Sequence, residues 1–162
     1  MGISLSDNPN LRKLVREIRS VRNHPFRLKQ LLAEYEANYG EDANSAVLQI
    51  VAEDTRRIWA GIAYDKGSNS LDDLLDCLWI QFEDTGGEFA LHHEDGAIHV
   101  CATKCPIADV YKRIGKESLG MLFHCSSDPF IVEGFNDSIE FSLAKTLMEG
   151  DDYCDHRYSL KN

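Results

Sequence analysis

The sequence predicts an α+β fold, in which a helical N-terminal half packs on a four-stranded antiparallel sheet with short helices between two hairpins. Apolar residues recur with a helical period of about 3.6 as far as residue 84, and the period changes to about 2 after Gly86-Gly87. With 162 residues, 43% of them hydrophobic, the chain is large enough to fold without disulfides or a metal. We therefore expect a single domain over residues 1–162, with a helical leader (1–66) and an α+β region (67–162).

Four helices are expected in the first half of the chain. The apolar spacing predicts helices over residues 8–22, 25–39 and 42–64. Pro25 separates the first two, because proline disfavours helical geometry in the residue before it. Residues 66–70 are typical of a linker, and Ser70 is expected to cap a fourth helix.

The second half alternates strands with short helices. Residues 88–93 and 97–104 flank Asp95-Gly96, a strong signal for a tight hairpin turn. Short helices are expected over residues 106–114, 117–125 and 128–134. Residues 138–148 and 153–160 should form a second hairpin around a turn at 149–152, which would pair Leu147 with Cys154.

The charge is uneven along the chain. The formal net charge is −10, but residues 1–66 carry +1 and residues 67–162 carry −11. An acidic chain is a poor ligand for nucleic acid, and no apolar run is long enough to span a membrane. The start lacks the pattern of a signal peptide, so we expect a cytoplasmic protein. The basic stretch 11–30 is either a solvated helix face or a contact for an acidic partner, including a second copy in a homo-oligomer.

Five cysteines carry most of the chemical interest: Cys77, Cys101, Cys105, Cys125 and Cys154. Their number is odd and no secretion signal precedes them, so reduced thiols are expected. The absence of a Cys-x-x-Cys pair argues against a classical zinc site, although distant thiols with His124 or His156 would still allow a divalent metal.

Two sites in the sequence favour catalytic chemistry. Cys105 precedes Pro106 at an expected helix N-terminus, where the helix dipole would lower the pKa of the thiol; the alternative is an inert cysteine. His124, Cys125 and Asp128 place an imidazole, a thiol and a carboxylate within five residues. Asp128 also precedes Pro129, which is typical of a helix N-cap.

Three runs carry a resemblance to a known family: Thr103-Lys104-Cys105-Pro106, His124-Cys125-Ser126-Ser127-Asp128 and Thr146-Leu147-Met148-Glu149-Gly150-Asp151-Asp152-Tyr153-Cys154. Over roughly residues 70–160 the sequence resembles the L-2-amino-thiazoline-4-carboxylic acid hydrolase family. The last of the three runs is also similar to four-vinyl-reductase-type ligand-binding domains, which combine helices with an antiparallel sheet.

The resemblance implies a hydrolase that opens a small cyclic amidine-type C–N bond. Cys105 or Cys125 would attack or activate water through a metal, and His124 and Asp128 would move protons. Substrate contacts are expected from Thr146, Asp151 and Cys154, with Arg113, Lys145 or Arg157 holding the substrate carboxylate. The alternative is a non-catalytic domain that binds a small molecule in an apolar pocket or senses redox state or metal.

Overall fold

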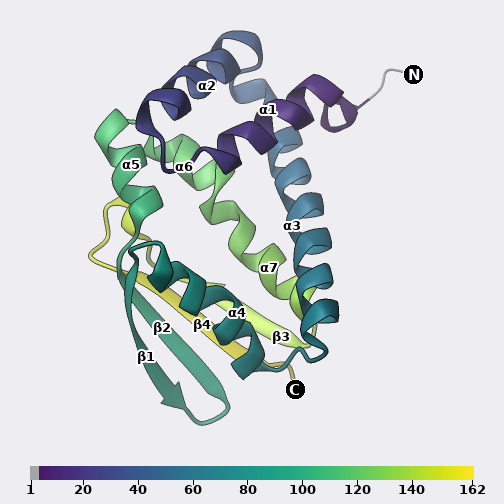
Figure 1. Cartoon of the computed structure of the whole chain (residues 1–162), viewed down its shortest axis with the longest axis vertical. Coiled ribbons are helices and arrows are strands. Elements are labelled where there is room, and N and C mark those ends of the chain that lie inside the picture. Colours follow the sequence, from purple (N-terminus) through teal and green to yellow (C-terminus); the bar gives the residue numbers. More distant parts are fainter. Residues whose placement is uncertain (1–3) are drawn as a thin grey trace.

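The computed structural model describes residues 4–162 and confirms the α+β class (Figure 1). Helices α1 (Pro9–Ser20) and α2 (Pro25–Asn38) lie in the upper part of the molecule, and α3 (Asn44–Lys66) runs from there down to the level of the sheet. The side chain of Asn8 caps α1 by accepting hydrogen bonds from the backbone N–H groups of Asn10 and Leu11. The three predicted helices agree with these bounds to within two residues at each end.

Helix α4 (Leu71–Asp84) follows the linker and begins as the sequence predicts. Ser70 and Asp73 form a capping box, in which each side chain accepts a hydrogen bond from the other residue's backbone N–H. Helix α3 ends at Gly67, whose φ of 77° is a left-handed conformation that favours glycine.

A four-stranded antiparallel sheet forms the lower part of the molecule. Its strands β1 (Glu88–Glu94), β2 (Ala97–Lys104), β3 (Ile139–Leu143) and β4 (Cys154–Leu160) lie in the order β1-β2-β4-β3. The predicted β1–β2 hairpin around Asp95-Gly96 is confirmed. Helix α4 and the later helix α7 (Asp128–Phe135) both pack on one face of this sheet, which we call the inner face (Figure 1).

The register predicted for the second hairpin is wrong. Leu143 pairs with His156 and Ile139 with Leu160, so β3 ends four residues before Leu147. Thr146 instead caps a 3-10 turn, η4 (Leu147–Glu149), and its own N–H donates to Asp151 Oδ2 at 2.9 Å. Such local side-chain hydrogen bonds compete with strand pairing and break the ladder. The register differs from the expected one by two residues, which leaves Cys154 on the inner face.

Three short elements connect β2 to β3: α5 (Pro106–Ile114), α6 (Glu117–Phe123) and the 3-10 turn η3 (Cys125–Ser127), which leads into α7. They join two hydrophobic cores. The upper core lies among α1, α2, α3, α5 and α6, and the lower core lies between α4, α7 and the inner face of the sheet. Cys154 packs against both cores, so the start of β4 lies at the junction of the two parts.

In the part of the chain that the structure describes, no helix combines the length and the hydrophobicity needed to cross a membrane.

Candidate functional site

Four of the predicted site residues come together from four separate elements. Cys105 precedes α5, Cys125 begins η3, Asp128 begins α7 and Cys154 begins β4. Their charges act on one another, since Asp128 raises the pKa of all three thiols, and Cys105 raises those of Cys125 and Cys154. We call these four residues the central cluster.

The structure corrects the prediction that Cys105 is an activated thiolate. The residue does occupy the N-cap of α5, where the backbone N–H groups of Ile107 and Ala108 act to lower the pKa of the thiol. Burial is the larger influence, and the net result is a raised pKa. Cys105 is therefore protonated at neutral pH.

The other two thiols of the cluster are also protonated. Burial raises the pKa of Cys154 to about 11 and raises that of Cys125 further. Cys154 Sγ in addition accepts a hydrogen bond from the backbone N–H of Leu147 at 3.2 Å. Without a bound ligand, none of the three thiols is a thiolate near neutral pH.

Asp128 is the group of the cluster that titrates near neutral pH. Burial raises the pKa of its carboxyl from 3.8 to about 7, and Arg19 opposes this shift. The prediction that Asp128 is an N-cap is wrong: Ser127 takes that position, and Asp128 is the first residue of α7. The reason is that Ser127 already has helical geometry, because η3 continues directly into α7.

His124 lies beside the cluster as a buried neutral imidazole. Its Nε2 is 2.8 Å from the hydroxyl oxygen of Tyr111. Burial, and then the charges of Arg19 and Arg22, hold the pKa of His124 well below its ordinary value. Together with Tyr111, His124 forms a neutral hydrogen-bonded pair at the edge of the cluster.

The sequence patterns do not single out Arg19. Its guanidinium donates a hydrogen bond to the backbone carbonyl of Phe123, and its charge acts on Asp128 and Tyr111. Desolvation by burial, and then the nearby Arg22, lower its own pKa. A signal was present: Arg19 comes four residues after buried Val15, so it continues the buried stripe of α1.

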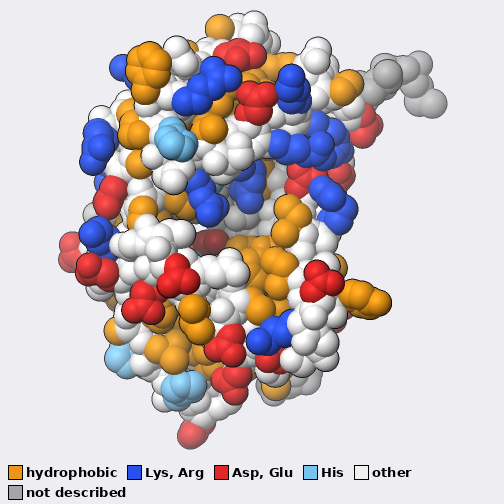
Figure 2. Space-filling model, in the orientation of Figure 1, with side chains coloured by type: hydrophobic (Ala, Val, Ile, Leu, Met, Phe, Trp, Pro, Cys, Tyr) orange, Lys and Arg blue, Asp and Glu red, His pale blue; other side chains and the backbone are white. Residues whose placement is uncertain are grey.

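The surface of the molecule is hollowed on this side. Figure 2 shows the hollow between the upper helices and the lower part of the molecule. Lysine and arginine side chains gather along its upper side, hydrophobic side chains lie along its lower side, and an acidic side chain is recessed within it. Such an arrangement suits a small ligand that carries both an apolar body and a negative charge.

The remaining predicted substrate contacts do not lie together in one place. Thr146 and Asp151 bind each other and shape the loop before Cys154. The three predicted carboxylate binders are separate: Arg113 is exposed on α5, the Lys145 ammonium lies 5.0 Å from the Tyr153 ring, and Arg157 lies on the outer face of the sheet.

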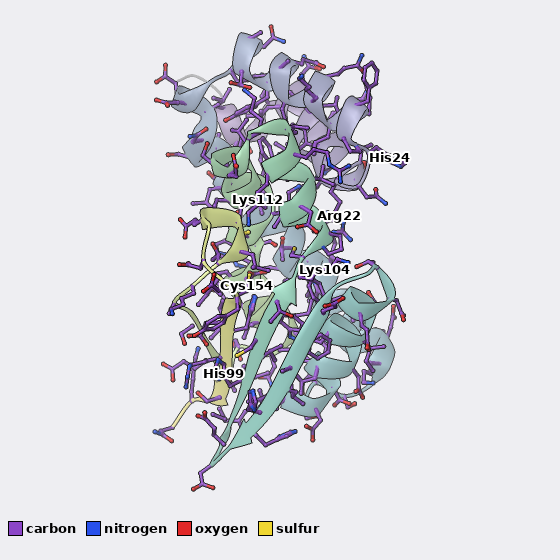
Figure 3. All side chains as sticks on the ribbon, turned by 90° about the vertical axis from the view of Figure 1, so that its left-hand side faces the viewer. Arg22, His24, His99, Lys104, Lys112 and Cys154 are labelled. Atoms are coloured by element: carbon purple, nitrogen blue, oxygen red, sulfur yellow. The ribbon has the colours of Figure 1, made fainter. Side chains whose placement is uncertain are left out.

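A groove of about 580 Å³ opens beside α5, α6 and η4. Its lining includes Lys112, Met121 and Met148. The charge of Lys112 lowers the pKa of Cys154, and Figure 3 shows the two residues on the same side of the molecule. The groove therefore lies next to the Cys154 end of the central cluster.

Among residues 4–162, no group of three or more His, Cys, Asp and Glu side chains is arranged to hold a metal ion.

A family model described as L-2-amino-thiazoline-4-carboxylic acid hydrolase matches residues 20–158, which include the central cluster. No curated protein matches the chain. Among solved structures, the chain is similar to a trafficking protein particle complex subunit 3 from Naegleria fowleri covalently bound to palmitic acid. The TM-score is 0.49 and the identity 15%, over 94% of this chain and 96% of that chain.

Proposed function

The chain belongs to the L-2-amino-thiazoline-4-carboxylic acid hydrolase family. From this premise we propose that the central cluster hydrolyses a ring C–N bond of a small cyclic substrate that bears a carboxylate. The observation that carries the proposal is the convergence of Asp128 with three thiols and Arg19. These groups come from segments far apart in the sequence, and together they offer a proton-transfer group and a cation.

In the proposed reaction, Asp128 acts first as a base and then as an acid. The ionised carboxylate takes a proton from water as the water oxygen bonds to the ring carbon between nitrogen and sulfur. The C–N bond then breaks, and the protonated Asp128 returns its proton to the leaving nitrogen. The ring opens, one water is consumed, and Asp128 ends as it began.

Asp128 suits this role better than the thiols do. A base works best when its pKa lies near the working pH, and burial raises the pKa of Asp128 to about 7. Burial raises the pKa values of Cys105 and Cys125 instead, which leaves little thiolate for direct attack. We assign these two cysteines to the lining of the site, and neutral His124 to holding its wall in place.

We assign the substrate carboxylate to Arg19, with Arg22 beside it. A guanidinium can bind a carboxylate with two parallel hydrogen bonds, and it offsets the repulsion of an anion by the acidic second half of the chain. Arg157, on the outer face, pairs with Glu94 at 3.5 Å. It serves as a matched control for the loss of an arginine.

The test is turnover of L-2-amino-thiazoline-4-carboxylate, followed by mass spectrometry of the ring-opened product. We expect kcat/KM to rise as the pH rises through about 7. Asp128→Asn should lower kcat by at least ~100-fold, whereas Asp72→Asn, at an exposed position on α4, should not. Arg19→Lys should mainly raise KM, while Arg157→Lys should leave KM unchanged.

The cysteine variants decide between a water and a thiol nucleophile. With water as nucleophile, Cys105→Ala and Cys125→Ala keep most of their activity. If a folded Cys125→Ala protein shows no turnover, the Cys125 thiol rather than water is the nucleophile. If the Asp128→Asn protein remains active, the proposal is wrong.

A second candidate function is ligand binding without turnover. It is favoured because all three thiols are protonated and His124 is a neutral imidazole, and such groups can bind a ligand without activating it. A thermal shift with the thiazoline carboxylate, in the absence of any ring-opened product, would support this candidate over hydrolysis.

A further inference from the structure

A second group of reactive side chains lies on the outer face of the sheet, away from the central cluster. His99 and Cys101 are two residues apart on β2 and therefore share a face. Asp155 on β4 lies directly opposite Cys101 in the β2–β4 ladder. Because helices α4 and α7 pack on the inner face, this trio lies on the face that the described helices leave uncovered.

The three side chains contact one another through a single ring nitrogen. Cys101 Sγ lies 3.4 Å from His99 Nε2 and 4.0 Å from Nδ1, so Nε2 is the nearer partner of the thiol. The same Nε2 contacts Asp155 Oδ1. Arg157 Nε lies 3.6 Å from this carboxylate oxygen and holds it from the other side. Nε2 therefore lies between the thiol and the carboxylate, so a proton that passes from sulfur to an unprotonated Nε2 can be held there by a hydrogen bond to Asp155.

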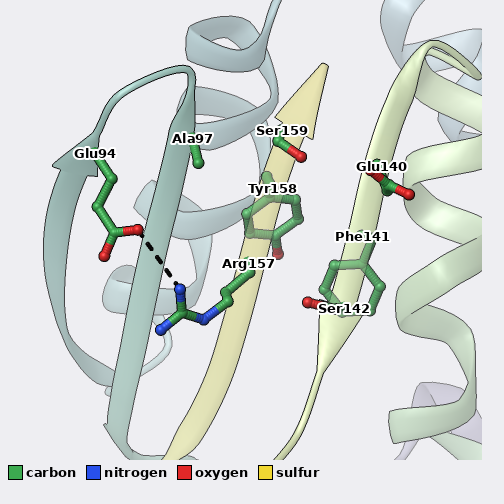
Figure 4. Close-up of a pocket in the computed structure, with 8 residues that line it drawn as sticks. All are labelled: Glu94, Ala97, Glu140, Phe141, Ser142, Arg157, Tyr158 and Ser159. Atoms are coloured by element: carbon green, nitrogen blue, oxygen red, sulfur yellow. Dashed lines mark ion pairs between the residues drawn. The ribbon is translucent and has the colours of Figure 1, made fainter. Parts of the chain in front are cut away.

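The trio is partly shielded from solvent, and Cys101 is partly exposed. The side chains of His99 and Asp155 are 14% and 12% exposed. A groove of about 440 Å³ on the same face is lined by Arg157, Ser142 and Ser159, among others, and Arg157 connects it to Asp155. Figure 4 shows the Glu94–Arg157 ion pair along this groove, with the strands in front of the helices. A small molecule bound in this groove would therefore lie one residue, Arg157, away from the trio.

We propose that Cys101 is a modification site, at which His99 and Asp155 activate the thiol to form a mixed disulfide with a small disulfide molecule. The thiol gives its proton to Nε2 of His99, and Asp155 accepts a hydrogen bond from the resulting imidazolium. The Cys101 sulfur then attacks one sulfur of the disulfide, whose S–S bond breaks. The leaving thiolate takes the proton from His99, so the products are one mixed disulfide and one free small thiol.

The three thiols of the central cluster do not compete with Cys101 for this reaction. Burial raises the pKa values of Cys105, Cys125 and Cys154, and thiol–disulfide exchange needs a thiolate that can be reached. Cys154 pairs with Ala102, next to Cys101 in the ladder, but it faces the opposite side of the sheet. The mixed disulfide on Cys101 is therefore not displaced by a neighbouring thiol.

The probe is oxidised glutathione, added in excess to the folded full-length protein. We expect peptide mapping by mass spectrometry to locate the first modification at Cys101. His99→Ala and Asp155→Asn should slow it by at least ~10-fold, and added imidazole should restore part of the rate in His99→Ala. His93→Gln changes an exposed histidine elsewhere on β1 and is the matched control, with no expected effect.

Far-UV circular dichroism of each variant separates loss of activation from loss of fold. First modification at another cysteine of the wild-type protein would overturn the proposal. So would an unchanged rate at Cys101 in a folded His99→Ala protein. The test does not involve the thiazoline substrate, so its result is independent of the function proposed for the central cluster.

Discussion

At the scale of a single residue, the raised pKa of Asp128 that suits it to proton transfer also makes the stability of the folded protein depend on pH. Burial raises its pKa from 3.8 to about 7 in the folded protein. Between these two values the folded state keeps a proton that the unfolded state has lost, so stability falls as the pH rises through this window. The full penalty is present above about pH 7.

The variant Asp128→Asn should remove that penalty, because an amide does not ionise. We expect it to be more stable than the wild type by about 1–3 kcal/mol near pH 8, with a smaller difference near pH 5. Urea denaturation at the two pH values measures this. A difference that does not depend on pH would show that the carboxyl is not desolvated.

His156 makes the opposite prediction. It is buried, its Nδ1 has no hydrogen-bond partner among residues 4–162, and its ring meets the edge of Trp79 at a centroid distance of 4.8 Å. Burial lowers its pKa from 6.5 to about 4, so the unfolded state binds a proton first and stability is lost as the pH falls through this range.

His156→Phe should therefore stabilise the protein by about 1–2 kcal/mol near pH 5, because an unpaired polar atom and a titrating group are both removed. The gain should be smaller at neutral pH. Thermal unfolding at the two pH values tests this, and His24→Phe, at an exposed position before α2, is the control. A loss of stability at both pH values would indicate a hydrogen bond to His156 that the structure does not contain.

At the scale of elements, the contact between α3 and α7 depends on a glycine. A Cβ at Gly134 would lie 2.4 Å from the backbone oxygen of Arg56, and backbone atoms cannot move aside cheaply. Gly134→Ala should therefore destabilise the protein by about 2 kcal/mol, although alanine favours helices.

Gly61 supplies the matched control on α3, since nothing lies within 4 Å of a Cβ built there. Gly61→Ala should stabilise the protein by about 0.5–1 kcal/mol. Urea denaturation of the two variants gives free energies of unfolding with opposite signs of change. A stabilising Gly134→Ala would mean that the two helices can separate without loss.

The elements whose signals are local could be predicted from the sequence. Ser70 and Asp73 mark the start of α4, Asp95-Gly96 marks the β1–β2 turn, and Pro106 and Gly115 mark the ends of α5. The β3–β4 register could not be predicted, because the hydrogen bond between Thr146 and Asp151 replaces the strand pairing that alternation suggests. Alternation identifies the face of a residue but not where pairing stops.

The sequence could indicate which residues belong to the candidate site, but not that they lie close together. Cys105, Cys125, Asp128 and Cys154 stand out in the sequence by type and neighbours, but only tertiary packing brings them together. Packing also reverses the expected pKa shift of Cys105, since burial outweighs the helix N-terminus. Arg19 enters from the helical half, where its charge suggested a solvated helix face or a contact for an acidic partner.

At the scale of the whole molecule, the helical half packs against the candidate site rather than standing apart from it as a leader. Arg19 contacts Phe123 of α6, and Cys154 packs on both cores. We therefore expect the two cores to unfold together in one cooperative transition.

Two probes test this expectation, because one reports on the lower core and the other on the whole molecule. Trp59 and Trp79 both pack in the lower core, so tryptophan fluorescence follows that core, while far-UV circular dichroism follows the helices of both cores. We expect the two urea curves to coincide, and Cys154→Ala to shift both by about 1 kcal/mol. Separate midpoints would define two independently folding parts.

The pairing of β2 with β4 has a kinetic consequence. Ala102 pairs with Cys154, and this contact closes a loop that contains α5, α6, α7 and β3. Cys105 and Cys154 stand at the mouth of that loop, while Cys125 and Asp128 lie within it. Contacts between residues so distant in the chain form slowly, because closing a long loop loses much conformational entropy. The helices can therefore form early during folding, while the central cluster exists only after the last and longest-range strand pairing is made.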